Sequence, residues 1–210
     1  PNWFFDYPNE VSFPNAIFHW SECRDTSQSG DIKNCWELSR WNWAPTLSRA
    51  FILSGETKYV DFLNKLIEDW CKSNPYNGGI NWLCGQEISI RLINALLSWK
   101  LLESNGKRKY PRLLFKRTEF VAYHLRRISK TIYYAKAQNN NHWITESAAL
   151  FIGGNWLLKT KNIFNEEAKM WSQIGRSELE KGIKKLVMND GSFSQQSLTY
   201  HRFVVDTLSQ

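Results

Sequence analysis

The stretch over residues 143–158 constrains the fold most, because nearly every residue in it is apolar. A helix with this composition presents apolar side chains on more than one face, so it must be buried between other elements. The residues just before it are polar: three asparagines at 139–141 precede His142, and Glu146 follows one helical turn later. The sequence therefore predicts a polar patch held at the start of a buried helix.

This short polar motif admits two interpretations. Asparagine is a favoured N-cap residue, so one of the three can cap the helix while the others project elsewhere. His142 and Glu146 are four residues apart and share one face of the helix, where both can handle protons. In the structural alternative, the asparagines only end a loop, His142 is a packed core histidine and Glu146 has a capping role. The motif alone does not separate the two.

The composition indicates a folded, basic protein. The chain has 210 residues, of which 42% are hydrophobic and 15% aromatic, enough for one domain with a sizeable core. Its net charge of +7 favours a polyanionic partner such as nucleic acid, anionic lipid or acidic polysaccharide. The basic residues are scattered, for example over 107–109 in an expected loop, which is also typical of a solvated surface. No stretch is long enough for a transmembrane helix, and the chain begins at Pro1 without a signal peptide, so we expect a fragment or a processed chain.

The cysteines give little indication of function. Cys23, Cys35, Cys71 and Cys84 show no C-x-x-C spacing, which argues against a zinc ribbon or a thioredoxin-type motif. An even number permits disulfides, but buried thiols are an equal alternative in a mostly helical chain of this size.

Hydrophobic periodicity predicts a chain made of helices, over about 36–53, 59–70, 86–101, 120–132, 143–158 and 166–188, and from about 195 onward. Helices that are apolar on two faces alternate with helices that are apolar on one, at a recurrence of roughly fifty to sixty residues. A two-faced helix must lie inside an array of hairpins. The predicted fold is all-α, an incomplete (α/α) toroid over 36–210 with an irregular aromatic-rich segment over 1–35 packed on it. Successive inner helices run parallel, so their starts share the mouth of one cleft.

A second polar motif lies at the start of the last predicted helix. Tyr200, His201 and Arg202 supply a phenol, an imidazole and a fixed cation within a few residues. In the alternative, Tyr200 is a core tyrosine with a satisfied hydroxyl and Arg202 pairs with an acid such as Glu87 or Glu146.

Together the two motifs suit β-elimination of a uronic-acid glycosidic bond. An enzyme of this kind removes the proton at C5, which is α to a carboxylate, and protonates the leaving oxygen at C4. The carboxylate must be neutralised by an amide or a cation, because negative charge develops there in the transition state. A base and an acid complete the set. Asn141, His142, Tyr200 and Arg202 can supply these roles without a metal.

Four ordered motifs carry a resemblance to a known family. They are residues 30–40, residues 79–87 with Gly79-Ile80-Asn81-Trp82 and Gln86-Glu87, residues 140–146, and residues 190–203. Together they resemble the toroid domain of the heparinase II/III-like polysaccharide lyases, which include heparin, heparan and related alginate lyases. The resemblance implies a lyase that cleaves a uronic-acid-containing acidic polysaccharide, heparin/heparan sulfate-like or alginate-like.

The resemblance also implies roles for single residues. Asn141 matches the family's carboxylate-neutralising Asn, His142 the adjacent His that can act as base, and Tyr200 the catalytic Tyr. Gln86 and Arg202 match substrate-contacting positions. Further candidates for binding substrate are expected at the same mouth of the cleft: Glu87, Glu146, His201 and Arg40.

In this family a β-sandwich region follows the toroid and supplies a further active-site His and, in some members, zinc. Neither is present in this chain, so we expect no cofactor within it and only half of the cleft. The resemblance implies a periplasmic or secreted enzyme, and it leaves the oligomeric state open.

Three other functions stay open from the residues. A glycoside hydrolase could use paired carboxylates among Glu37, Glu87 and Glu146. The chain could instead bind an acidic glycan without turnover. Nucleic-acid binding fits the basicity but no motif, and a zinc site from His142, Glu146 and His201 rests on a loose pattern.

Overall fold

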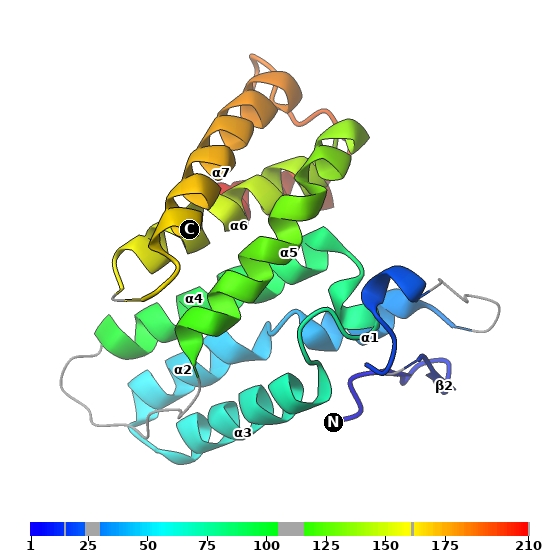
Figure 1. Cartoon of the computed structure of the whole chain (residues 1–210), viewed down its shortest axis with the longest axis vertical. Helices are drawn as coiled ribbons and strands as arrows, with labels where there is room; N and C mark the ends of the chain where they lie inside the picture. The colour runs from blue at the N-terminus through cyan, green and yellow to red at the C-terminus, as the bar shows by residue number, and fades with distance from the viewer. Residues whose placement is uncertain (15, 24–29, 105–115, 161, 210) are drawn as a thin grey trace. The chain divides into compact units, whose positions relative to one another are not determined.

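The computed structural model describes residues 1–14, 16–23, 30–104, 116–160 and 162–209. It confirms the all-α class, since helices make up most of the described chain (Figure 1). The chain divides into two compact units, residues 1–116 and 117–210. The predicted basic loop at 107–109 lies outside the described residues. None of the helices in the described parts has the length and apolarity needed to cross a membrane.

The first unit combines a small hairpin with helices. Strands β1 (Phe5–Asp6) and β2 (Val11–Ser12) are antiparallel, with Phe5 opposite Ser12. The helical elements follow in the order η1 (Trp20–Glu22), α1 (Ile32–Ser39), α2 (Trp43–Ser54), α3 (Lys58–Ser73), η2 (Ile80–Trp82) and α4 (Gly85–Ser104). Helix α2 packs against both α3 and α4.

The single helix predicted over 36–53 is wrong, because the chain forms α1 and α2 with a break between them. Trp41 lies in the break with φ of 60°, in the left-handed region that side chains rarely adopt. Its ring is fully buried, so packing compensates for the backbone conformation. Pro45, the third residue of α2, lacks an N–H and therefore suits the first turn of a new helix better than the middle of a long one.

Asp6 organises the N-terminal segment. Its buried carboxylate accepts hydrogen bonds from the backbone N–H of Asp31 at 2.7 Å, from Asn34 Nδ2 at 2.9 Å and from Asn9 Nδ2 at 2.8 Å. Burial alone would raise the pKa of Asp6, but these hydrogen bonds outweigh it and lower the pKa below its ordinary value. The carboxylate thus joins the hairpin to the start of α1.

A buried arginine lies at the centre of the first unit. The Arg91 guanidinium is fully buried and donates to the carbonyls of Ser39 at 3.2 Å and Asn81 at 3.0 Å. Its Cζ lies 4.3 Å from the ring centroid of Trp70 and 5.4 Å from that of Trp82. Burial lowers the pKa of Arg91 to about 9. Through this side chain, α4 is joined to the end of α1 and to η2.

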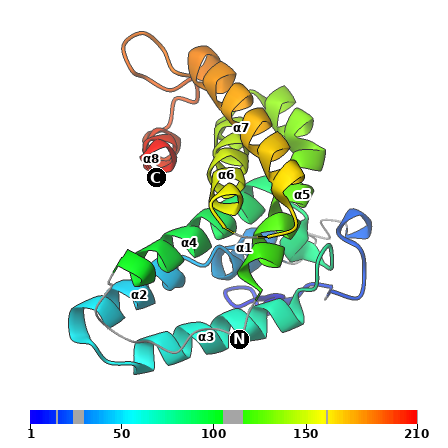
Figure 2. The ribbon, with the colours of Figure 1, turned by 60° about the vertical axis from the view of Figure 1, so that its left-hand side comes forward.

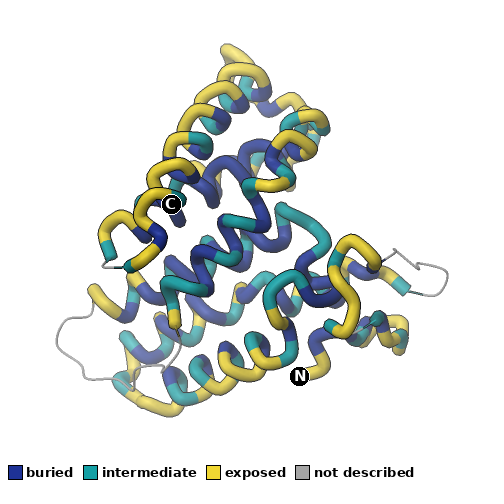
Figure 3. The backbone as a smooth tube through the Cα atoms, in the orientation of Figure 1, coloured by how far each residue is buried: buried dark blue, intermediate teal, exposed yellow. Residues whose placement is uncertain are grey.

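The second unit is a set of packed helices: α5 (Arg117–Gln138), α6 (Asn141–Leu158), α7 (Asn165–Leu186) and α8 (Leu198–Leu208). Helix α6 packs against the other three, and Figure 2 shows it beside α7. Twelve of its 18 residues are buried, so it is covered on more than one side, as predicted (Figure 3).

Glycines bring α6 and α7 into backbone contact. A Cβ at Gly154 would lie 2.7 Å from the backbone N of Ser172, and a Cβ at Gly175 would overlap the backbone of Phe151. Side chains at these positions would force the helices apart, so the contact depends on glycine.

The last helix differs from the prediction in two ways. It begins at Leu198 rather than near 195, because Ser197 caps it by accepting from the N–H of Tyr200. Only Val204 and Thr207 are buried in it, so the expectation of a helix buried on two faces is wrong for the described chain. Val204 packs with Trp143, Ile144, Leu186 and Phe193.

Gly175→Ala should destabilise the protein by roughly 2–3 kcal/mol, because the added methyl group overlaps the backbone of α6. Urea unfolding followed by circular dichroism measures the change. The exposed Ser177→Ala on the same helix is the matched control and should be neutral within about 0.5 kcal/mol. Equal stabilities for the two variants would contradict the close approach of α6 and α7.

Candidate active site

The start of α6 is built by the three asparagines. Asn139 has φ of 50°, which turns the chain sharply out of α5. Asn140 is the N-cap, and its Oδ1 accepts from the N–H of His142 at 2.9 Å. Asn141 is the first helical residue and is only 2% exposed. The prediction that one of the three asparagines caps the helix is confirmed, and the capping residue is Asn140.

His142 and Glu146 face each other along α6, as their spacing predicted. His142 Nδ1 lies 3.7 Å from Glu146 Oε1, and the two side chains are 27% and 4% exposed. Burial raises the pKa of Glu146, while His142 and the buried Arg127 of α5 partly offset this effect. Within the described residues, Glu146 Oε2 is buried without a hydrogen-bond partner. The structural alternative is wrong on both points, since His142 reaches solvent and Glu146 caps no helix end.

Trp143, which follows His142 in α6, packs on the side of α6 that faces α7. Its Nε1 donates to Glu178 Oε2 at 3.2 Å, and Lys136 and Lys181 form ion pairs with the same carboxylate at 3.1 and 2.8 Å. Burial would raise the pKa of Glu178, but the two lysines lower it below its ordinary value. This cluster anchors the residue that directly follows His142.

The segment between α7 and α8 is attached to the start of α6. Phe193 is 5% exposed and packs with Trp143 and Ile144. Gln195 Oε1 accepts from the backbone N–H of Asn141 at 2.8 Å. Both contacts were missed from the sequence, which placed a helix start near 195.

The three residues of the second motif are the third to fifth residues of α8. Tyr200 is 43% exposed, and its hydroxyl makes no hydrogen bond to any described residue, so the alternative of a satisfied core tyrosine is wrong. Arg202 is exposed, with Nε 3.7 Å from Asp206 Oδ2, rather than paired with Glu87 or Glu146. Tyr200 is thus accessible to solvent.

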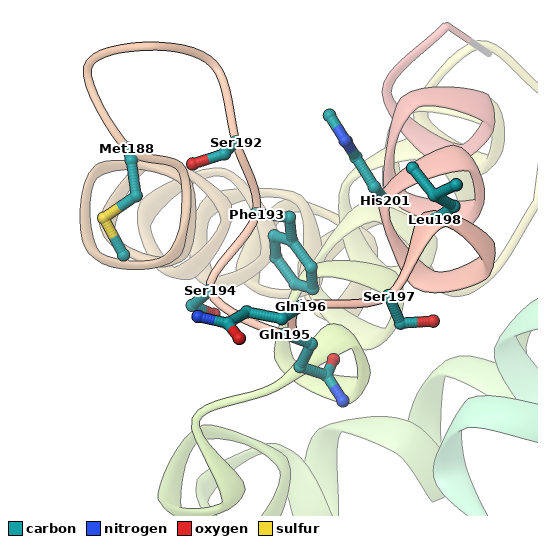
Figure 4. Close-up of a pocket in the computed structure, with 9 residues that line it drawn as sticks. All are labelled: Met188, Ser192, Phe193, Ser194, Gln195, Gln196, Ser197, Leu198 and His201. Atoms are coloured by element: carbon teal, nitrogen blue, oxygen red, sulfur yellow. The ribbon is translucent and has the colours of Figure 1, made fainter.

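A pocket of about 450 Å³ lies between this segment and α8 (Figure 4). Apart from the imidazole of His201, its lining side chains are polar and uncharged or apolar. They are those of Met188, Ser192, Phe193, Ser194, Gln195, Gln196, Ser197, Leu198 and His201. Figure 4 also shows Gln195 extending away from the loop toward the ribbon of α6. The structure therefore places His201 at the pocket, and it places Asn141, His142 and Glu146 together at the start of α6.

The remaining candidates lie in the first unit, where Arg40 and Glu87 form a bidentate ion pair. Arg40 Nε and Nη2 donate to the two oxygens of Glu87 at 2.6 and 2.9 Å, and Nη1 donates to Glu37. The hydrogen bonds from Arg40 to Glu87 raise the pKa of Arg40. Gln86 is half-buried at the start of α4. Both oxygens of Glu87 are engaged, so this carboxylate is poorly placed to deliver a proton as the hydrolase hypothesis requires.

No three His, Cys, Asp or Glu side chains gather closely enough to hold a metal ion in the described ranges, so His142, Glu146 and His201 form no zinc site there. All four cysteines are free thiols, and the disulfide alternative is wrong. Burial raises the pKa of Cys35 and of Cys71 to about 12, so neither is a reactive thiol.

Glu146→Gln should stabilise the protein at neutral pH and leave its stability unchanged at about pH 4. The folded state raises the pKa of Glu146, so the stability that its carboxyl contributes is fully present below the unfolded pKa of about 4.3 and is lost as the pH rises through the folded pKa. Glutamine carries no charge and escapes this loss. Thermal unfolding at both pH values measures the difference.

The matched control is Glu180→Gln, which removes one negative charge from the exposed side of α7. An equal melting-temperature gain for Glu146→Gln at both pH values would show that burial of its charged carboxylate is not the cause.

Comparison with known proteins identifies the family. The family model described as Heparinase II/III N-terminus matches residues 14–210. The chain is similar to a heparin-sulfate lyase of Bacteroides stercoris, with 26% identity over 79% of the chain and 26% of that protein. A heparin-sulfate lyase of Bacteroides thetaiotaomicron is 24% identical over 80% of the chain and 23% of its own length. The chain thus spans about a quarter of these relatives, and no solved structure matches it significantly. The family match covers nearly the whole chain, so the protein belongs to the Heparinase II/III N-terminus family.

Proposed function

We propose that the protein is a polysaccharide lyase that cleaves a uronic-acid-containing polysaccharide, heparin/heparan sulfate-like or alginate-like, by β-elimination. Its family and the names of its relatives support the reaction class. The observation that carries the proposal is the attachment of the segment before Tyr200 to the start of α6. Gln195 binds Asn141, so a carboxamide, an imidazole and an exposed phenol belong to two segments that are hydrogen-bonded to each other.

In the proposed reaction, the Asn141 carboxamide donates to the substrate carboxylate and stabilises the charge that develops there. His142, or Tyr200 for the other stereochemistry at C5, removes the C5 proton. The electron pair of that C–H bond forms the C4–C5 double bond, and the C4–O bond breaks. Tyr200 gives a proton to the leaving oxygen. The buried carboxylate of Glu146 beside His142 suits it to orient the imidazole and to balance its charge.

The other candidates would bind the chain of the substrate on either side of the cleaved bond. In this proposal His201 and Arg202 contact it from α8, while Gln86, Arg40 and Glu87 contact it from the first unit. Glu87 then acts by orienting Arg40, which it binds through both oxygens.

We extend the proposal to the architecture and location that the family membership supports. The helices of both units would form an incomplete (α/α) toroid with the candidate residues at one mouth. A β-sandwich region beyond this chain would complete the cleft, with zinc bound there in some family members. The enzyme would act in the periplasm or outside the cell, where acidic polysaccharide is available.

Tyr200→Phe should lower the rate of elimination by at least about 100-fold, because it removes the proton given to the leaving oxygen. The full-length gene product is incubated with heparin, heparan sulfate and alginate, and the ultraviolet absorbance of the new C4–C5 double bond is followed. Tyr134→Phe, which makes the same change at an exposed tyrosine of α5, is the matched control and should retain full activity.

Each other outcome points elsewhere. Rising absorbance that survives Tyr200→Phe would remove Tyr200 from the mechanism. New reducing ends without absorbance would indicate a hydrolase, and glycan binding with neither signal would indicate a non-catalytic binding protein.

A further inference from the structure

One side chain connects the two parts of the candidate site in the second unit. Gln195 lies in the segment before α8, five residues before Tyr200, and Asn141 is 54 positions earlier in the chain. The Asn141 N–H donates to Gln195 Oε1 at 2.8 Å, and this hydrogen bond brings the two distant parts of the sequence into contact.

The hydrogen bond acts on a backbone group that needs a partner. The first N–H groups of a helix have no acceptor within the helix. In α6, Asn140 supplies the acceptor for His142, and Gln195 supplies the acceptor for Asn141. The acceptor for Asn141 therefore comes from the segment that leads to Tyr200, so a shift of that segment along α6 changes the distance between Tyr200 and Asn141.

In the segment between α7 and α8, one residue packs against α6 and another makes the hydrogen bond to it. Phe193 is buried against Trp143 and Ile144 and holds the segment on α6. Gln195 is only half-buried, and the hydrogen bond to Asn141 is its directional contact with α6. Loss of the amide oxygen should therefore leave the segment attached but free to shift along α6.

We propose that Gln195 is a positioning residue. Its amide oxygen fixes the distance and orientation between Asn141 and Tyr200. The inference rests on the proposed function, since it concerns the geometry between the group that neutralises the substrate carboxylate and the group that protonates the leaving oxygen. Misplacement of about 1 Å at such groups costs turnover much more than substrate binding. Gln195 thus controls kcat and has little effect on KM.

Three variants of the full-length gene product test the role. Gln195→Met keeps the length of the side chain and removes the acceptor, and it should lower kcat about tenfold with KM changed less than about twofold. Gln195→Glu retains an acceptor oxygen and should restore kcat to within about threefold of the unsubstituted protein. Gln173→Met makes the same change at an exposed glutamine of α7 that does not line the pocket, and it should leave both constants unchanged.

Hydrogen exchange provides a readout that does not depend on turnover. In Gln195→Met, the amide of Asn141 should exchange about tenfold faster than in the unsubstituted protein, because its acceptor is lost. In Gln195→Glu and Gln173→Met, the amide of Asn141 should exchange at the unsubstituted rate.

The outcomes separate this inference from the proposed function. If the unsubstituted protein is inactive on every acidic glycan, the proposed function fails, and unchanged exchange at Asn141 in Gln195→Met would show independently that the hydrogen bond is absent. If the unsubstituted protein is active and Gln195→Met retains its kcat, or Gln195→Glu loses as much as Gln195→Met, the positioning role fails and the lyase assignment stands.

Discussion

Helices α6 and α7 approach so closely that only glycine fits at two points of their contact, and the geometry of the second unit depends on this approach. Gly154 and Gly175 allow backbone to meet backbone, so α6 has little freedom to slide or rotate against α7. Farther along, Gly182 of α7 faces the side chains of Trp143 and Ile144. The contact thus extends to the first turn of α6, where the candidate residues begin. The packing of α6 on α7 therefore also restrains the polar residues at the start of α6.

Charge is distributed unevenly among the candidate residues of this basic chain. In the first unit, one guanidinium of Arg40 meets two carboxylates, those of Glu37 and Glu87. In the second unit, the carboxylate of Glu146 is buried beside His142, and the buried Arg127 adds a positive charge that acts on it. The net charge of +7 is therefore a property of the chain as a whole, while the candidate residues include two carboxylates, Glu87 and Glu146, that each lie beside a basic side chain.

The parts of the fold that depend on periodicity were predictable from the sequence. Helices α3 to α7 follow the apolar spacing closely, and the asparagine cap of α6 follows from local chemistry. The break at Trp41 was not foreseen, because a positive φ at a tryptophan is stabilised by tertiary packing rather than by local preference. The cleft that the resemblance implies needs the placement of whole helices, which no local pattern determines.

The candidate site was predictable to a similar extent, since the spacing of His142 and Glu146 placed both on one face, and the structure agrees. Gln195 left no such signal, because a glutamine in a polar segment looks the same whether it binds solvent or a distant backbone amide.

The tryptophans that surround Arg91 belong to a larger set in the first unit, and this uneven distribution has a spectroscopic consequence. Eight of the eleven tryptophans lie in the first unit, and two of them have a buried cation over their rings. Intrinsic fluorescence is therefore dominated by residues 1–116, whereas far-ultraviolet circular dichroism reports on the helices of both units. The two optical signals weight the halves of the chain differently, so their denaturation curves coincide only if both halves lose structure in one cooperative step.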